Sequence, residues 1–218
     1  MVDLVSVLDQ RHLYLCVPHR DDLPTFLPAV LRGGVDVVQL REKDLDDASR
    51  IADATLMIPI CREFGVPFIM NDSPELALAV GADGVHVGQE DQSVSRCREL
   101  LGLDAIVGLS THSTAEFDDA LNQSATYFSA GPIVATPTKP GRTGTGLQYV
   151  VASQERSDRP VFVTGGVNAE NIAQLVTVGL RHFVIVRALT ESNNPEKAAK
   201  RIREELDQAL SAMPVEPT

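Results

Sequence analysis

Eight times along the chain, a short apolar run is followed by a longer stretch with apolar residues at helical spacing. The short runs are too apolar to have a solvated face, which is typical of parallel strands that are covered by helices. We expect strands at Leu13–Val17, Val35–Leu40, Pro67–Met70, Gly84–Val87, Ala105–Leu109, Tyr127–Ala130, Pro160–Thr164 and His182–Val186. We expect helices at Leu23–Arg32, Leu45–Phe64, Glu75–Val80, Ser93–Leu101, Thr114–Asn122, Leu147–Gln154, Ala169–Val178 and Pro195–Met213.

Eight similar units without a long insertion predict the α/β class and a closed (β/α)8 TIM barrel. The alternative is an open, doubly wound parallel sheet. No linker-like segment divides the 218 residues, so we expect one domain over residues 1–218, with a frayed tail at 214–218.

Composition narrows the class of partner. The chain is 44% hydrophobic and 22% charged, as is usual for a folded soluble protein. Its formal net charge of −11 argues against nucleic acid and against an anionic membrane as the main partner. A small anionic ligand is still compatible with this charge, because such a site is local.

The cysteines and the N-terminus suggest a compartment. Cys16, Cys61 and Cys97 are scattered, which fits buried thiols in a reducing environment better than disulfides or a zinc site. The first residues do not resemble a signal peptide, and no apolar run reaches the ~20 residues that cross a bilayer. We expect a cytoplasmic protein, and the sequence leaves open whether it forms a homo-oligomer.

The segment Gly131–Gly146 is rich in glycine, proline and threonine and has no carboxylate, although the chain is acidic. Bared backbone amides, hydroxyls and cations together suit a polyanion such as a phosphate. The alternative is a solvated loop. The groups that would bind the anion are Thr136, Thr138, Lys139, Arg142 and Thr143.

In a barrel, functional residues should follow the strands at the carboxyl mouth. Gln39, Arg41 and Lys43 alternate at the end of the second strand, so all three should face one side and offer donors to phosphate oxygens. The alternative is that Arg41 pairs with a neighbouring carboxylate in solvent.

Two aspartates follow the next two strands. Asp72 and Asp91 should lie at the same level, where hard carboxylate oxygens beside a phosphate site would bind Mg²⁺. Asn71 could orient a ligand amine or ring nitrogen, and Glu90 is a weaker candidate for the metal. The alternative for Asp72 is that it only caps the helix beginning near Pro74.

The remaining strand ends supply fewer candidates. Ser110 could donate to a phosphate, whereas we expect His86 to be a packed core histidine and His112 to be an ordinary polar residue of a surface loop. Gly166 and Arg187 follow the seventh and eighth strands, where this fold often binds phosphate. A tight turn capped by Asn168 would also explain the glycine pair Gly165-Gly166.

Six ordered motifs at these strand ends give the chain a family resemblance. They are VQLREK (Val38–Lys43), ND (Asn71–Asp72), GADGVHVGQED (Gly81–Asp91), GLSTH (Gly108–His112), GP…TPTKPG (Gly131–Gly141) and TGGVN (Thr164–Asn168). Over nearly its whole length the chain resembles the thiamine-phosphate synthase family. This resemblance implies a transferase that joins hydroxymethylpyrimidine diphosphate to thiazole phosphate, giving thiamine phosphate and pyrophosphate.

The resemblance also implies a role for each matching position. Gln39, Arg41, Lys43, Asn71, Ser110 and Lys139 would hold the pyrimidine diphosphate, and Arg41, Lys43, Ser110 and Lys139 would act in catalysis. Asp72 and Asp91 would bind Mg²⁺. Thr136, Thr138, Gly166, Val186 and Arg187 would hold the thiazole phosphate. Three residues depart from the commoner family pattern: Ser73, Thr164 and Arg187.

The expected mechanism is electrostatic: Mg²⁺ and cations stabilise charge on a departing diphosphate, so no strong base is needed. One alternative is a thiazole tautomerase of the same superfamily, in which His86 or His112 would have to transfer protons. Others are a non-catalytic regulator that binds a phosphorylated metabolite, or another phosphate-handling barrel enzyme such as an isomerase.

Overall fold

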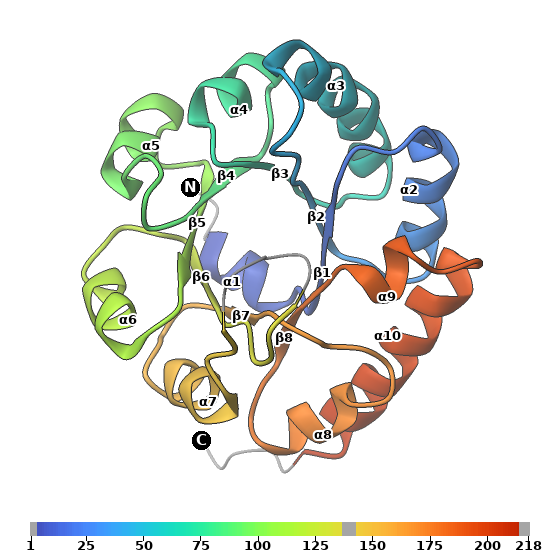
Figure 1. Cartoon of the computed structure of the whole chain (residues 1–218), viewed down its shortest axis with the longest axis vertical. Coiled ribbons are helices and arrows are strands. Elements are labelled where there is room, and N and C mark those ends of the chain that lie inside the picture. Colours follow the sequence, from blue (N-terminus) through green and yellow to red (C-terminus); the bar gives the residue numbers. More distant parts are fainter. Residues whose placement is uncertain (1–3, 137–142, 214–218) are drawn as a thin grey trace.

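A computed structural model describes residues 4–136 and 143–213 and shows a closed barrel of eight parallel strands in chain order (Figure 1). The first and last strands pair with each other, with Leu13 opposite Phe183, so the open-sheet alternative is wrong. The strands are β1 (Leu13–Val17), β2 (Val37–Leu40), β3 (Phe68–Asn71), β4 (Gly84–Val87), β5 (Ile106–Thr111), β6 (Tyr127–Ala130), β7 (Val161–Val163) and β8 (His182–Ile185).

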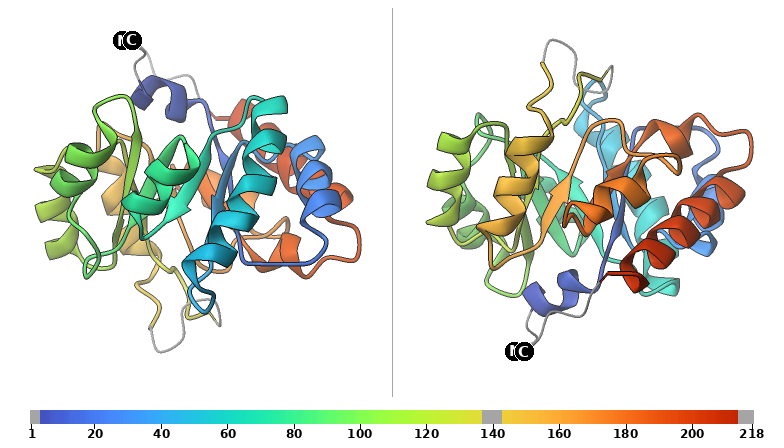
Figure 2. Two further views of the ribbon diagram at one scale, coloured as in Figure 1. Left: turned by 90° about the horizontal axis from the view of Figure 1, so that it is seen from above. Right: turned by 90° about the horizontal axis from the view of Figure 1, so that it is seen from below.

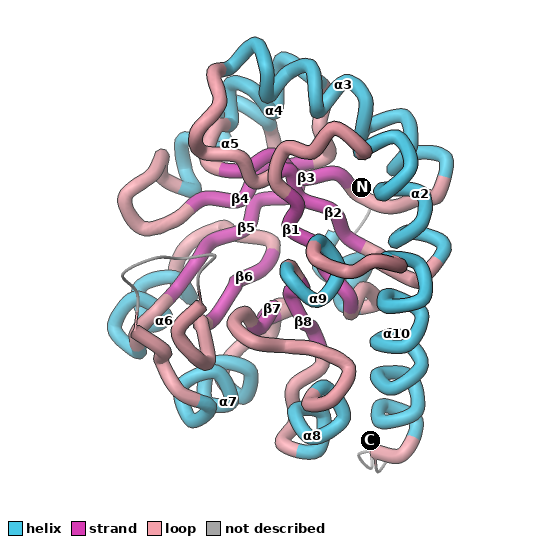
Figure 3. Tube along the Cα trace, turned by 45° about the vertical axis from the view of Figure 1, so that its right-hand side comes forward, coloured by secondary structure: helices cyan, strands magenta, loops and turns pink. Residues whose placement is uncertain are grey.

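The described residues form ten helices, and most of these surround the barrel as an outer ring (Figure 3). They are α1 (Leu4–Asp9), α2 (Leu23–Arg32), α3 (Asp47–Glu63), α4 (Pro74–Val80), α5 (Val94–Leu101), α6 (Thr114–Leu121), α7 (Leu147–Glu155), α8 (Ile172–Thr177), α9 (Arg187–Thr190) and α10 (Pro195–Ser211). Every expected strand and helix is present, with ends that differ by up to a few residues. The sequence did not reveal α1 and α9, because helices this short carry too few residues to show a period.

Apolar packing occupies two places in the barrel. The larger cluster fills the layer between the strands and the outer helices and includes Leu15, Phe128 and Phe183. A smaller one lies inside the barrel, where Phe162 packs with Leu8 of α1. Figures 1 and 2 show α1 lying across one end of the barrel, opposite the end where the described residues 131–136 and 143–146 project. The interior is therefore filled at the amino end of the strands, and the carboxyl end remains available for a site.

Short caps fix the turns at the carboxyl mouth. The side chains of Ser73, Ser93 and Ser113 accept hydrogen bonds from backbone N–H groups in the first turns of α4, α5 and α6. The alternative that Asp72 caps α4 is wrong, because Ser73 occupies that position and leaves the Asp72 carboxylate for other contacts.

The last long helix, α10, is amphipathic rather than apolar throughout. α10 buries Ala199, Ile202 and Leu206 against the barrel and exposes charged residues on its other side. Across residues 4–136 and 143–213, we find no helix with both the length and the apolar character that bilayer crossing requires.

Candidate active site

A cavity of about 590 Å³ opens at the carboxyl ends of the strands, a size typical of small-molecule sites. Eleven of the predicted site residues line it: Gln39, Arg41, Lys43, Asn71, Asp72, Asp91, Ser110, Thr136, Gly166, Val186 and Arg187. Thr138 and Lys139, like Arg142, lie outside the described residues. The strand-end argument therefore brought together residues that are far apart in the sequence.

One part of the cavity, which we call the charged side, is formed by Arg41, Lys43, Asp72 and Asp91. The Lys43 ammonium lies 2.7 Å from a carboxylate oxygen of Asp72. Asp91 accepts a hydrogen bond of 2.7 Å from the backbone N–H of Gly88, which holds the turn after β4. Asp72 is thus held against a cation at the mouth, and Asp91 is held by the backbone of the turn.

The surroundings of the Asp72 carboxyl group raise its pKa. Burial raises its pKa above the ordinary value, and the charge of Asp91 and a hydrogen bond to it raise the pKa further, although the Lys43 contact lowers it. Within the described segments, no group of three or more histidine, cysteine or carboxylate side chains could hold a metal. The Asp72 and Asp91 carboxylates, which interact with each other, still fit Mg²⁺, because this ion commonly takes one or two protein carboxylates together with substrate phosphates.

Arg41 does not form an ion pair with any described carboxylate. The strand end is instead fixed through the backbone, since the Arg41 N–H donates to the Val17 carbonyl at 2.9 Å. The neighbouring Glu42 accepts hydrogen bonds from the backbone N–H groups of His19 and Asp44, at 3.1 and 2.9 Å. The alternative of a solvent ion pair for Arg41 is therefore wrong among these residues, and its guanidinium is available to an anion.

Two buried polar atoms at the cavity lack partners among the described residues. The Asn71 side-chain nitrogen and the Thr164 hydroxyl oxygen are both buried without a hydrogen bond, and both residues line the cavity. An unsatisfied buried polar group is costly unless a ligand or ordered water completes it. This observation supports the expectation that Asn71 orients a polar atom of a ligand, and it adds Thr164.

Sequence reasoning missed the position of two histidines at the cavity. His86 is buried and packed, as expected, but it also lines the cavity, and its ring nitrogens lie 2.9 Å from the Tyr127 hydroxyl and 2.8 Å from the Ser110 hydroxyl. His112 was expected on the surface, but it also lines the cavity and lies 2.5 Å from the Gly131 carbonyl. A signal was available for His86: strand alternation places it on the same face of β4 as Gly84, inside the barrel.

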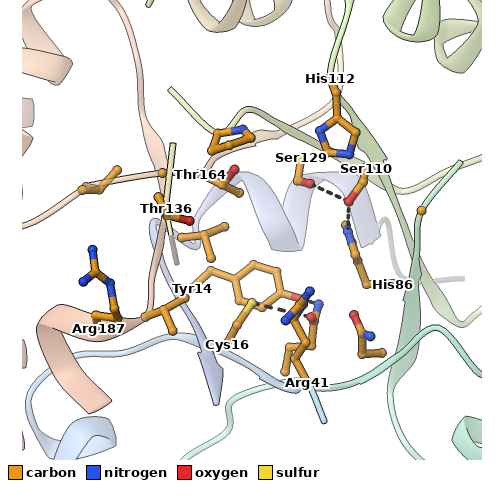
Figure 4. Close-up of a pocket in the computed structure, with 18 of the residues that line it drawn as sticks. Tyr14, Cys16, Arg41, His86, Ser110, His112, Ser129, Thr136, Thr164 and Arg187 are labelled. Carbon is orange, nitrogen blue, oxygen red and sulfur yellow. Dashed lines mark hydrogen bonds between the residues drawn. The ribbon is translucent and has the colours of Figure 1, made fainter. Parts of the chain in front are cut away.

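Another part of the cavity, which we call the glycine side, is formed by Gly165, Gly166, Val186 and Arg187. Both glycines have positive φ, +99° and +79°, so their backbone conformation strongly disfavours other residues. Figure 4 shows Arg187 across the cavity from His86 and Ser110. Arg187 has no ion pair with a described carboxylate, and it lines the cavity, so its guanidinium is also available to an anion.

The turn after β7, which carries Gly165 and Gly166, is held by the Asn168 side chain, as the alternative for this segment predicted. The Asn168 side-chain oxygen accepts from the backbone N–H of Glu170 and of Asn171, at 2.9 and 3.2 Å. The Asn171 side chain in turn donates to the Gly166 carbonyl at 2.9 Å. The capped turn and the position of Gly165 and Gly166 at the cavity are therefore compatible.

Comparison with known proteins accounts for this arrangement. The family model described as thiamine monophosphate synthase matches residues 13–189, which include every strand and all the site residues named above. The chain belongs to the thiamine monophosphate synthase family.

Individual relatives agree with this family assignment. A thiamine-phosphate synthase of Acidothermus cellulolyticus is 43% identical over 199 residues, covering 89% of this chain and 93% of the relative. One of Synechocystis sp. is 39% identical over 93% of this chain, which spans only 59% of that longer relative. The solved thiamine phosphate pyrophosphorylase of Pyrococcus furiosus superposes with a TM-score of 0.85 at 25% identity, covering 94% of this chain and 99% of the other.

Proposed function

We propose that the protein is an alkyl- or aryl-transferase that condenses 4-amino-2-methyl-5-hydroxymethylpyrimidine diphosphate with thiazole phosphate, releasing pyrophosphate. The observation that carries the proposal is one cavity lined at one part by Arg41 and Lys43 and at another by Arg187 beside two glycines, which we name the charged side and the glycine side. A reaction that expels one phosphate group and retains another needs such a pair. Membership of the thiamine monophosphate synthase family supports the same chemistry.

The charged side would receive the diphosphate. Arg41 and Lys43 supply positive charge where the leaving group would gain negative charge, and Ser110 adds a hydroxyl donor. Asp72 and Asp91 would hold Mg²⁺, which when bound supplies further charge stabilisation to the departing diphosphate. Lys139, outside the described residues, is proposed from the sequence to act with them.

The glycine side would keep the thiazole phosphate in place. The backbone N–H groups near Gly166 and the Arg187 guanidinium suit a phosphate monoester, with Thr136 at the edge of the cavity and Thr138 assigned from sequence. Anchoring this phosphate would hold the thiazole ring facing the reacting carbon of the pyrimidine, which lowers the entropic part of the barrier. Val186 contributes apolar surface beside the ring.

The test is a two-substrate assay with the purified chain, with and without Mg²⁺, in which pyrophosphate and thiamine phosphate are both quantified. We expect both products in equal amounts, only when both substrates and Mg²⁺ are present. Conversion of the thiazole substrate alone would instead support the tautomerase. Binding of either substrate without turnover would support the regulator.

A further inference from the structure

A continuous line of hydrogen bonds crosses the barrel interior through residues that line the cavity and one that lies behind them. It joins Gln39 of β2, Tyr14 of β1, Tyr127 of β6, His86 of β4 and Ser110 of β5, and we call it the hydroxyl chain. The Gln39 amide nitrogen lies 2.8 Å from the Tyr14 hydroxyl, which lies 2.8 Å from that of Tyr127. The Tyr127 hydroxyl then lies 2.9 Å from His86 Nδ1, and His86 Nε2 lies 2.8 Å from Ser110 Oγ. Figure 4 shows the bond between His86 and Ser110 at the cavity.

The first link gives the hydroxyl chain a direction. The Gln39 side-chain oxygen accepts from the Cys16 thiol at 3.6 Å, so its nitrogen faces Tyr14 and donates. A phenol has one hydrogen, and Tyr14, which accepts from Gln39, can give that hydrogen only to its other hydroxyl neighbour, Tyr127. Burial raises the pKa of both tyrosines, so both hydroxyls keep their protons.

The direction continues through the imidazole. Since Tyr127 accepts from Tyr14, its own hydrogen goes to His86 Nδ1. A neutral histidine whose Nδ1 accepts carries its hydrogen on Nε2, and that N–H donates to Ser110. The Ser110 hydrogen must then point away from His86, toward Ser129 Oγ at 3.2 Å or into the cavity.

We propose that Tyr127 is a positioning residue which, acting through His86, holds the imidazole as the Nε2–H tautomer and thereby aims the Ser110 hydroxyl hydrogen at the leaving diphosphate. The choice of diphosphate as acceptor rests on the proposed function, whereas the tautomer does not. Tyr127 is only 1% exposed, and it acts from behind the residues that line the cavity.

The first experiment reads the tautomer directly, without substrates. The full chain labelled with ¹⁵N-histidine is observed by NMR at about pH 8, where an ordinary histidine is neutral, and the signals are assigned with His86→Gln. We expect a protonated Nε2 and an unprotonated Nδ1 in the wild type. In Tyr127→Phe, Nδ1 loses its donor, and the signals should move toward the opposite tautomer. A protonated Nδ1 in the wild type would overturn the proposal.

Tyr149→Phe is the matched control. Its hydroxyl donates to Thr111 Oγ1 at 2.7 Å, on the same strand as Ser110, but Tyr149 belongs to α7 outside the barrel. This variant loses the same atom and a similar bond. We expect its His86 signals and its turnover to match those of the wild type.

The second experiment is a double-mutant cycle with Ser110→Ala. Removing a preorganised donor, as Ser110→Ala does, commonly costs ~10²–10³ in rate. Tyr127→Phe keeps the Ser110 hydroxyl but loses the contact that sets its direction, so we expect kcat to fall about tenfold, with KM for thiazole phosphate unchanged. In the Ser110→Ala background, Tyr127→Phe should cost nothing more. An additive loss would contradict action through Ser110. If the wild type performs no condensation, the proposed function fails, and the NMR result still decides the tautomer.

Discussion

The two sides of the cavity bind anions by different means. On the charged side, the Lys43 ammonium lies against the Asp72 carboxylate. The neighbouring Asp91 carboxylate raises the pKa of Asp72, so this side holds both a cation and two interacting carboxylates. On the glycine side, Gly165 and Gly166 line the cavity with positive φ, and Arg187 is without a described carboxylate partner.

The difference matches what each side is proposed to do. A leaving group gains charge during the reaction, so its site benefits from strong and adjustable fields, including a divalent cation. A phosphate that stays bound keeps the same charge throughout and needs only steady donors. Accordingly, damage to the charged side should appear in kcat, and damage to the glycine side should appear in KM.

The largest effect is expected for Asp91→Asn. The amide can still accept from the Gly88 N–H, so the turn should persist while a metal ligand loses its charge. We expect kcat to fall by ~10²–10³. Asp119→Asn, on the exposed outer face of α6, is the matched control and should keep wild-type turnover. Near wild-type kcat in Asp91→Asn at saturating Mg²⁺ would show that this carboxylate is not needed for catalysis.

Arg187→Ala should mainly affect the glycine side. A lost charge-assisted hydrogen bond costs about 1.5–3 kcal/mol, so KM for thiazole phosphate should rise by roughly 10- to 100-fold, with little change in kcat. Arg181→Ala removes a cation directly before the amino end of β8, away from the cavity, and is the matched control. An effect confined to the pyrimidine diphosphate would mean that the two sides are exchanged.

The pH dependence of Mg²⁺ activation tests the charged side. Metal binding requires a deprotonated carboxylate, and the raised pKa of Asp72 means that protons compete at higher pH than for an ordinary aspartate. The Mg²⁺ concentration for half-activation should therefore rise as pH falls, by up to about tenfold per pH unit below that pKa. Lys43→Met removes the contact that lowers the pKa, so this rise should begin at higher pH. A half-activation concentration independent of pH would contradict the assignment.

The smallest effect concerns the support of the charged side. Ser73 accepts from the Leu76 N–H at 3.2 Å, so Ser73→Ala should reduce the free energy of unfolding by about 1 kcal/mol, with little change in kcat. Denaturant unfolding measures the loss, and Ser211→Ala, at the exposed last residue of α10, is a control of equal size. A large loss of kcat without destabilisation would assign Ser73 to the chemistry instead.

The sequence predicted the barrel and most of the cavity for one physical reason. Parallel strands that follow each other through helices bring all their carboxyl ends to one mouth, so polar residues at the ends of β2, β3 and β8 had to meet there. This logic placed Arg41, Asp72 and Arg187 in one site without any knowledge of distances.

Contacts across the barrel could not be predicted in this way. Tyr14 and Tyr127 are 113 positions apart, and their hydrogen bond depends on how interior side chains of non-adjacent strands interlock. The same holds for the unpartnered Asn71 nitrogen, and for the helix cap, which Ser73 provides instead of Asp72. The local pattern of the sequence determined which residues reach the mouth. Only the tertiary structure decided which atoms are already satisfied there, because hydrogen-bond partners are set by packing between segments that are distant in the chain.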